Sequence, residues 1–278
     1  MSCARTLGLL SVLLAIGCVG LTPRPAGPQP LGTTSAGVLV AGVSLPDRGP
    51  GYVRARPGES TRFGAPGLVR TLTSAAAEVA ERFAGTAPMR IGDLGGPEGG
   101  RHPRHHSHRS GRDADLLFYL MDGSGRSVPG RGWLAFSRYG HAFDDGALYL
   151  FDDARNWHFV RTLLADPEAR VQWIFCSRGV KARLLRYAMA HEPDPELYAR
   201  AAYVLHQPER AAPHDDHFHV RVFCSPDERA SGCQDTGPRW PWLRPDVEET
   251  SAQGGEGLDD ASLVALLLDG DDPITTSE

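Results

Sequence analysis

Hydrophobic positions repeat at helical spacing over residues 67–84, and Gly85 follows where a helix would end. The side chains on the shared apolar face are Leu68, Leu72, Ala76, Val79 and Phe83. Weaker patterns of the same kind predict helices at residues 155–165, 180–190 and 195–206.

Strand-like runs lie between these predicted helices. The clearest one covers residues 217–223, where hydrophobic and polar side chains alternate. Its two faces carry Phe218, Val220 and Val222 on one side and His217, His219 and Arg221 on the other. Further strands are predicted at residues 38–45, 89–94, 114–120 and 171–176. Because helices and strands mix without strict βαβ repetition, we expect an α+β fold with a small antiparallel sheet flanked by helices.

The N-terminus has the pattern of an export signal. One positive charge precedes a short apolar run that ends Leu14-Ala15-Ile16-Gly17-Cys18, and the run is too short for a typical membrane span. Residues 1–18 are therefore predicted to be a signal peptide of the lipoprotein type, with a lipid anchor on Cys18. Simple secretion is the alternative. Residues 19–36 are rich in Pro, Gly, Thr and Ser and are predicted to be a linker.

Charge separates the predicted domain, residues 37–245, from an acidic tail, residues 246–278. The 278-residue chain has a net charge of −5, but no Lys or Arg follows Arg244, whereas ten acidic residues do. The tail is predicted to be disordered except for a short amphipathic helix at residues 258–268. The remainder carries only +5, which is too weakly basic for a nucleic-acid partner.

Cysteines and glycines add two local expectations. Cys224 and Cys233 are close in sequence and favour a small disulfide loop in an oxidising compartment. Cys176 follows an apolar run and is predicted to be a buried free thiol. The glycine-rich residues 95–100 lack the spacing of a phosphate-binding loop, and we interpret them as a mobile loop beside a site.

Six of the eleven histidines fall in two short windows: His105, His106 and His108, then His214, His217 and His219. On a strand, the last two point the same way and can reach one site. His108 and Asp115 are separated by six residues, including Gly111, so this stretch can turn back and bring the loop histidine to the carboxylate. Two imidazoles and one carboxylate leave a fourth position open, which is how catalytic zinc is held. From the residues alone, a solvated His/Arg loop and a half-buried polar strand remain alternatives.

Other chemistries lack their signatures. The chain has no S-x-x-K or G-x-S-x-G serine motif, no H-E-x-x-H zincin motif and no recognisable cysteine-protease signature. His102, His191 and His206 are predicted to be surface residues.

The two histidine windows resemble a known family. Residues 104–115 are similar to the Gly-His-x-Ser-His-x-x-Gly-x-Asp-x-Asp signature of penicillin-insensitive murein endopeptidases, and residues 214–219 to their His-x-x-His-x-His. The similarity covers roughly residues 37–241. Arg104 departs from it, because the family usually has Gly there.

The resemblance implies a zinc peptidase related to lysostaphin-type and D-Ala-D-Ala-type metallopeptidases. Such an enzyme hydrolyses D-alanyl to meso-diaminopimelyl cross-links between peptidoglycan stem peptides, in the periplasm or cell envelope. The implied zinc ligands are His108, Asp115 and His219, with His217 transferring the proton. One zinc is expected, because a second metal pair has no clear counterpart.

The resemblance also assigns the neighbouring residues. His214 and His105 would line the site, with His105 as an auxiliary ligand. Asp113 would orient a ligand histidine. Arg101 would bind a substrate carboxylate.

Two other functions stay open. A D,D-carboxypeptidase would use the same metal set to trim a terminal D-Ala. A non-catalytic wall-binding lipoprotein would retain zinc without turnover. The sequence makes no prediction of the oligomeric state.

Overall fold

The computed structural model describes residues 27–209 and 211–243. The predictions for the signal peptide, for lipidation of Cys18 and for the acidic tail at 246–278 lie outside these residues. Within the described part of the chain, no helix is long and apolar enough to cross a membrane.

A seven-stranded sheet forms the centre, with strand order β14-β13-β15-β8-β7-β5-β4. Its strands are β4 (Arg48–Gly49), β5 (Tyr52–Arg54), β7 (Met89–Ile91), β8 (Asp113–Leu117), β13 (Val171–Phe175), β14 (Leu205–His206) and β15 (His217–Val222). The four central strands pair antiparallel, whereas β14 and β5 join in parallel. The α+β class is confirmed. The sheet is larger than expected, and its outer pairings make it mixed.

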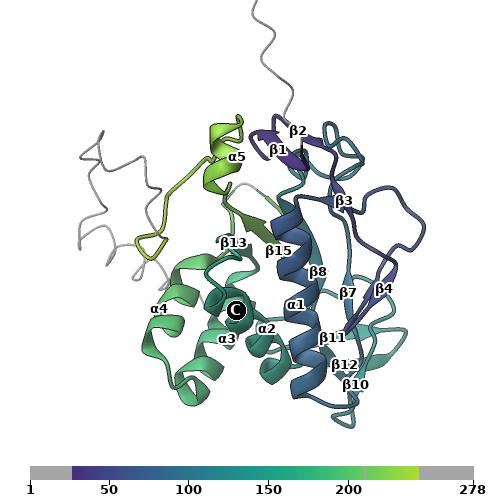
Figure 1. The fold of residues 1–278 in the computed structure, drawn as a ribbon. Helices are drawn as coiled ribbons and strands as arrows, with labels where there is room; N and C mark the ends of the chain where they lie inside the picture. The colour runs from purple at the N-terminus through teal and green to yellow at the C-terminus, as the bar shows by residue number, and fades with distance from the viewer. Residues whose placement is uncertain (1–26, 210, 244–278) are drawn as a thin grey trace, which may run out of the picture.

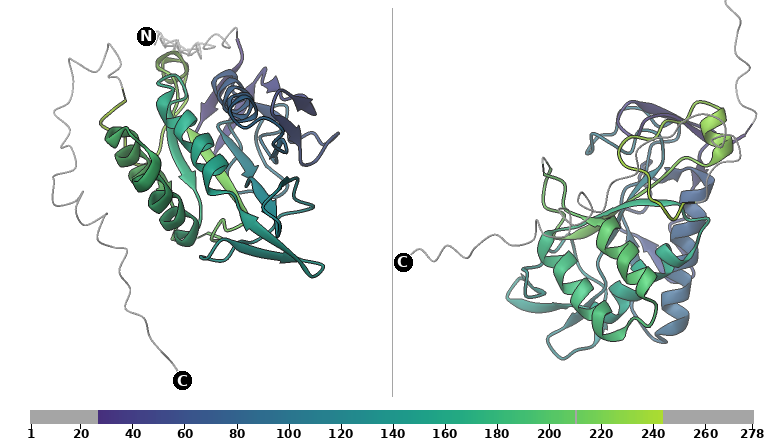
Figure 2. Two further views of the ribbon diagram at one scale, coloured as in Figure 1. Left: turned by 90° about the horizontal axis from the view of Figure 1, so that it is seen from below. Right: turned by 90° about the vertical axis from the view of Figure 1, so that its left-hand side faces the viewer.

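Four helices pack on this sheet, and Figure 1 shows them in front of the central strands. They are α1 (Pro66–Arg82), α2 (Asp153–Ala165), α3 (Arg178–His191) and α4 (Pro195–Val204), close to the predicted spans. The fourth stops at Val204 because the next two residues leave the helix and pair with β13 as β14. A short helix, α5 (Pro226–Ala230), lies beyond the sheet, near the N-terminal strands (Figure 2).

The hydrophobic core lies between the helices and one face of the sheet. The predicted apolar face of α1 is buried at Leu68, Leu72 and Val79. From β15, Phe218 and Val220 enter the same core and are completely buried. Because side chains alternate along a strand, the intervening residues of β15 face the opposite side of the sheet.

Smaller sheets complete the fold. A four-stranded sheet, which the hydrophobic pattern did not predict, consists of β10 (Ser127–Val128), β9 (Leu120–Asp122), β12 (Ala147–Phe151) and β11 (His141–Asp144). Two-stranded sheets pair β1 (Gln29–Gly32) with β2 (Gly37–Val40) and β3 (Val43–Ser44) with β6 (Phe63–Gly64). Strand β1 lies inside residues 19–36, so part of the expected linker belongs to the folded unit.

The glycine-rich loop is held by backbone hydrogen bonds rather than free. Gly95 exchanges hydrogen bonds with Phe63, and Gly100 N donates to Arg109 O at 2.8 Å. Gly99 has φ 65°, and a Cβ there would lie 2.0 Å from Arg109 O. Only glycine fits this approach, because any side chain would collide with the neighbouring backbone. The loop therefore packs against the segment that leads into β8, which differs from the mobile loop expected.

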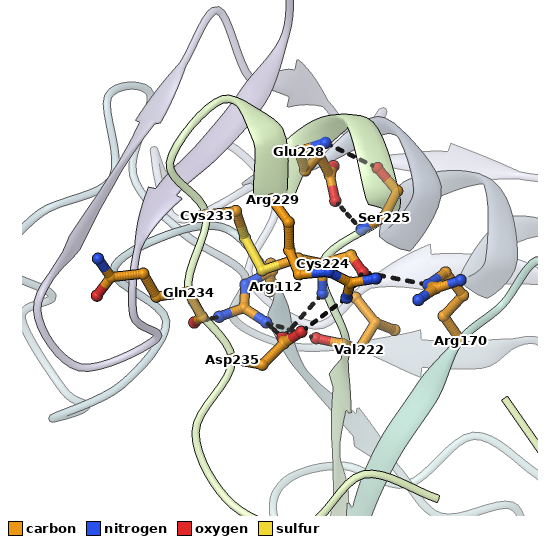
Figure 3. The surroundings of a disulfide bond; sticks show 10 residues. All are labelled: Arg112, Arg170, Val222, Cys224, Ser225, Glu228, Arg229, Cys233, Gln234 and Asp235. Atoms are coloured by element: carbon orange, nitrogen blue, oxygen red, sulfur yellow. Dashed lines mark hydrogen bonds and ion pairs between the residues drawn. A yellow bond between two sulfur atoms is a disulfide. The ribbon is translucent and has the colours of Figure 1, made fainter. Parts of the chain in front are cut away.

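A disulfide joins Cys224 to Cys233 across nine residues, as predicted. Figure 3 shows the Asp235 carboxylate beside this bond, where it accepts hydrogen bonds from Cys224 N at 2.9 Å and Arg112 Nη1 at 2.8 Å. Arg229 Nη1 donates to the same carboxylate at 3.1 Å. Arg112 is 1% exposed and directly precedes β8. The disulfide loop thereby anchors the start of that strand.

Replacing Cys224 and Cys233 with serine is expected to lower the free energy of unfolding by about 2–3 kcal/mol, because the unfolded chain gains freedom. Urea denaturation measures the change, with Cys3 and Cys18 replaced in both proteins and the buried free Cys176 retained. Reductant should destabilise the parent and leave the double variant unchanged. Equal stability of the two oxidised proteins would contradict the prediction.

Candidate metal centre

The Asp115 carboxylate on β8 is completely buried and lies at the centre of a histidine cluster. Both of its oxygens have ring nitrogens nearby. The four nitrogens within 3.5 Å are His105 Nε2 at 3.0 Å, His219 Nδ1 at 3.3 Å, His108 Nε2 at 3.4 Å and His217 Nε2 at 3.5 Å.

Strand register places the cluster on the sheet face opposite the core. On β15, His219 pairs with Asp115 of β8 and Phe175 of β13. Two residues along, Arg221 pairs with Asp113 and Trp173. We call these sets the metal row (Phe175, His219, Asp115) and the arginine row (Trp173, Arg221, Asp113). Neighbours within a row have Cβ atoms roughly 4.5–5.5 Å apart.

His108 reaches the cluster from the loop before β8. Its backbone is left-handed, with φ 66°, a conformation that stores about 1–3 kcal/mol in a non-glycine residue. Its backbone N donates to Asp113 Oδ2 at 3.2 Å, and its Nδ1 lies 3.2 Å from Leu94 O. Because a carbonyl only accepts, Nδ1 carries a proton, and Nε2 is the ring atom directed at Asp115.

His219 is oriented by a carboxylate on its far side. Its Nε2 lies 2.8 Å from Asp113 Oδ1, and Arg221 Nε donates to that same oxygen at 2.6 Å. The Nδ1 lone pair is therefore directed at Asp115. Burial lowers the pKa of His219 to about 4, despite the opposing Asp113, so the ring is neutral at neutral pH. A neutral imidazole is the form that binds metal.

His217 occupies the edge of the cluster. Its Nδ1 lies 2.5 Å from Asp216 Oδ1. Burial favours the neutral ring, but the nearby Asp115 and Asp216 carboxylates outweigh it and raise the pKa of His217 to about 9. The Trp133 ring stands perpendicular to it at 4.9 Å, and the His214 ring lies 5.1 Å away. Burial lowers the pKa of His214.

His105 lies between two carboxylates, Asp115 at 3.0 Å and Asp93 at 3.3 Å. Burial opposes its charge, but the two carboxylates outweigh it and raise the pKa of His105 to about 9. Arg104 donates to both oxygens of Asp93 at 2.7 Å, a bidentate geometry that fixes the carboxylate. The arginine that departs from the family signature thus supports the group beside His105.

The donor atoms fit a metal ion. One atom each from His105, His108 and Asp115 lie within 4.8 Å of one another. Both Asp115 oxygens, His108 Nε2 and His217 Nε2 are buried without a hydrogen-bond partner among the described residues. Buried polar atoms normally have hydrogen-bond partners. A cluster of buried donor atoms that converge without such partners is therefore suited to binding a cation. Nitrogen and carboxylate donors suit zinc.

The structure brings together seven of the eight residues predicted for the site: His105, His108, Asp113, Asp115, His214, His217 and His219. Arg101 is exposed and makes no hydrogen bond or ion pair with any described residue. His102 corrects the sequence analysis, because it is 6% exposed and its ring lies 4.8 Å from that of His105.

Four contributors escaped the sequence analysis: Asp93, Arg104, Asp216 and Trp133. Asp216 lies inside the second histidine window, and its adjacency to His217 was the available signal. Trp133 gave no signal, because its contact with His217 is a tertiary one made from the irregular segment between β10 and β11.

Sequence comparisons relate this chain to one family of known proteins. A sequence model described as penicillin-insensitive murein endopeptidase matches residues 30–241. A protein of that name from Haemophilus influenzae is 27% identical over 217 residues, which cover 76% of this chain and 68% of that protein. Another from Klebsiella pneumoniae is 34% identical over 122 residues, covering 41% and 44%. One from Escherichia coli is 34% identical over 99 residues, covering 35% of each chain.

Zinc affinity distinguishes two candidate ligand sets. Both contain His108 and Asp115, and the third ligand is His219 in one set and His105 in the other. We expect Asp115→Asn and His219→Ala to lose stoichiometric zinc, and Asp113→Asn to weaken it about 10- to 100-fold. His105→Ala should retain zinc with reduced affinity. Competition with a chromogenic chelator measures each constant. Loss of zinc in His105→Ala together with retention in His219→Ala would assign the third ligand to His105.

Proposed function

Because this chain belongs to the penicillin-insensitive murein endopeptidase family, we propose that it is a zinc-dependent endopeptidase that hydrolyses D-alanyl to meso-diaminopimelyl cross-links in peptidoglycan. The observation that carries the proposal is the buried Asp115 carboxylate with four histidine nitrogens within 3.5 Å. Family membership alone supports a murein peptidase. The donor set supports the metal-dependent reaction.

His108, Asp115 and His219 would hold one zinc ion. When bound, zinc polarises the scissile carbonyl and lowers the pKa of the attacking water. Asp113 and the carbonyl of Leu94 keep the two histidines in the tautomers that ligation needs.

His217 would transfer the proton. Asp216 fixes its Nδ1, so its Nε2 remains directed at the cluster, where it would give its proton to the leaving amine and regain one from the attacking water. His214 and His105 line the same site. Since water is the proposed nucleophile, no acyl-enzyme forms, and a β-lactam finds no side chain there to acylate.

The substrate places the protein in the bacterial periplasm or cell envelope. The Cys224–Cys233 disulfide suits an oxidising compartment. We propose that the signal peptide at residues 1–18 exports the chain and that a lipid on Cys18 anchors it to a membrane. Anchoring would raise the effective concentration of the domain at the wall.

Digestion of purified D,D-cross-linked muropeptide dimers, followed by mass spectrometry, tests this function. We expect dimers to become monomers, and we expect chelator or His219→Ala to stop the reaction, because both remove the metal. Readdition of zinc should restore activity to the chelated parent and not to the variant.

Two other outcomes contradict the proposal. Loss of a single D-Ala with the cross-link intact would show a D,D-carboxypeptidase. Intact dimers despite one bound zinc per chain would show a non-catalytic wall-binding protein.

A further inference from the structure

Arg221 has unused hydrogen-bond donors on the same sheet face as the candidate metal centre. Its Nε donates to Asp113, and its guanidinium carbon lies 5.4 Å from the centre of the Phe175 ring. Neither of its two Nη atoms has a hydrogen-bond partner among the described residues, and neither is fully buried. Both Nη atoms therefore remain open to solvent.

The surroundings of Arg221 fix its orientation. Asp113 is completely buried and holds Nε from one side of the arginine row. Trp173 pairs with Arg221 from the other side, and its half-buried ring lies 5.7 Å from that of Phe175 at an interplanar angle of 23°. A guanidinium held at Nε and bordered by aromatic rings presents its Nη pair as a preorganised fork. Such a fork matches the geometry of a carboxylate.

We propose that Arg221 binds the carboxylate of the substrate residue on the leaving side of the scissile bond, an inference that rests on the proposed function. In a D-alanyl to diaminopimelyl cross-link, the scissile nitrogen is attached to a carbon that also carries a carboxylate. Residues two apart on a strand are roughly 6–7 Å apart. This spacing lets a substrate whose scissile carbonyl lies at the metal row reach the arginine row with this carboxylate.

Arg101 and Arg104 suit this role less well. Arg101, which the sequence analysis assigned to this role, is exposed and has no hydrogen bond or ion pair with a described residue that would fix its orientation. Arg104 uses its Nε and Nη2 on Asp93 and Glu59. Arg221 combines a fixed orientation with free donors.

The test uses two cross-linked dimers that differ only at that carbon, one with a carboxylate and one with a carboxamide. We expect the parent protein to prefer the acid by about 10- to 100-fold in kcat/KM, mainly through KM, as for a charged hydrogen bond. Arg221→Gln should abolish the preference, and Arg221→Lys should retain part of it. The acid-to-amide ratio is the readout, because loss of the contact to Asp113 would slow both substrates alike.

Arg126→Gln is the matched control, since Arg126 is 81% exposed at the turn between β9 and β10 and should leave both rates unchanged. A parent without preference for the acid would overturn the proposal. So would a preference that survives in Arg221→Gln, or one that disappears in Arg101→Gln instead.

A binding measurement separates this inference from the proposed function. The probes are the monomeric product that bears the carboxylate and its carboxamide, titrated by calorimetry into the parent and into Arg221→Gln. Tighter binding of the acid to the parent alone supports Arg221 even if neither dimer is cleaved. Equal affinities in the parent reject Arg221 even if both dimers are cleaved.

Discussion

Two completely buried carboxylates, Asp113 and Asp115, lie on one face of β8, and the site is organised around their charge. Isolated buried anions are strongly destabilising, so partners must surround them. Arg221 and His219 hold the pKa of Asp113 below its usual range against the effect of burial. Asp115 has only histidines, which also depress its pKa. The charge of Asp113 is therefore compensated by hydrogen bonds from the protein, whereas both oxygens of Asp115 lack a hydrogen-bond partner within the described chain. This difference is the one expected between a carboxylate that orients a ligand and one that binds the metal.

The scaffold around β8 serves to hold the histidines against this strand. Gly99 allows the glycine-rich loop to contact the backbone at Arg109, and this contact secures the segment that holds His108 in its left-handed conformation. At the other end of that segment, buried Arg112 links the strand to the disulfide loop through Asp235. Local strain at a site persists where surrounding contacts determine the backbone, and both sets of contacts come from distant parts of the sequence.

Local periodicity predicted the elements that are long and amphipathic. The stripe beginning at Leu68 and the alternation around His219 each gave the correct element and the correct buried face. The two-residue strands β4, β6, β10 and β14 were missed, because so short an element has no periodicity of its own and depends on its partner strand. The site residues show the same contrast between what a local pattern predicts and what depends on tertiary contacts. Residue type and spacing indicated the candidate ligands, but the contacts of Arg104 and Trp133 arise from tertiary structure that no local pattern encodes.

Alternation along β15 couples the stability of the domain to the geometry of the site. The residues between the site side chains are Phe218 and Val220, and the Phe218 ring packs edge-on against Phe118 at 4.7 Å. A slip of one residue in register would turn these apolar side chains toward the metal row and move His219 into the core. Burial of one face thus fixes the register, and the register sets His219 opposite Asp115 on the other face. The packing of the core therefore supplies precision at the site.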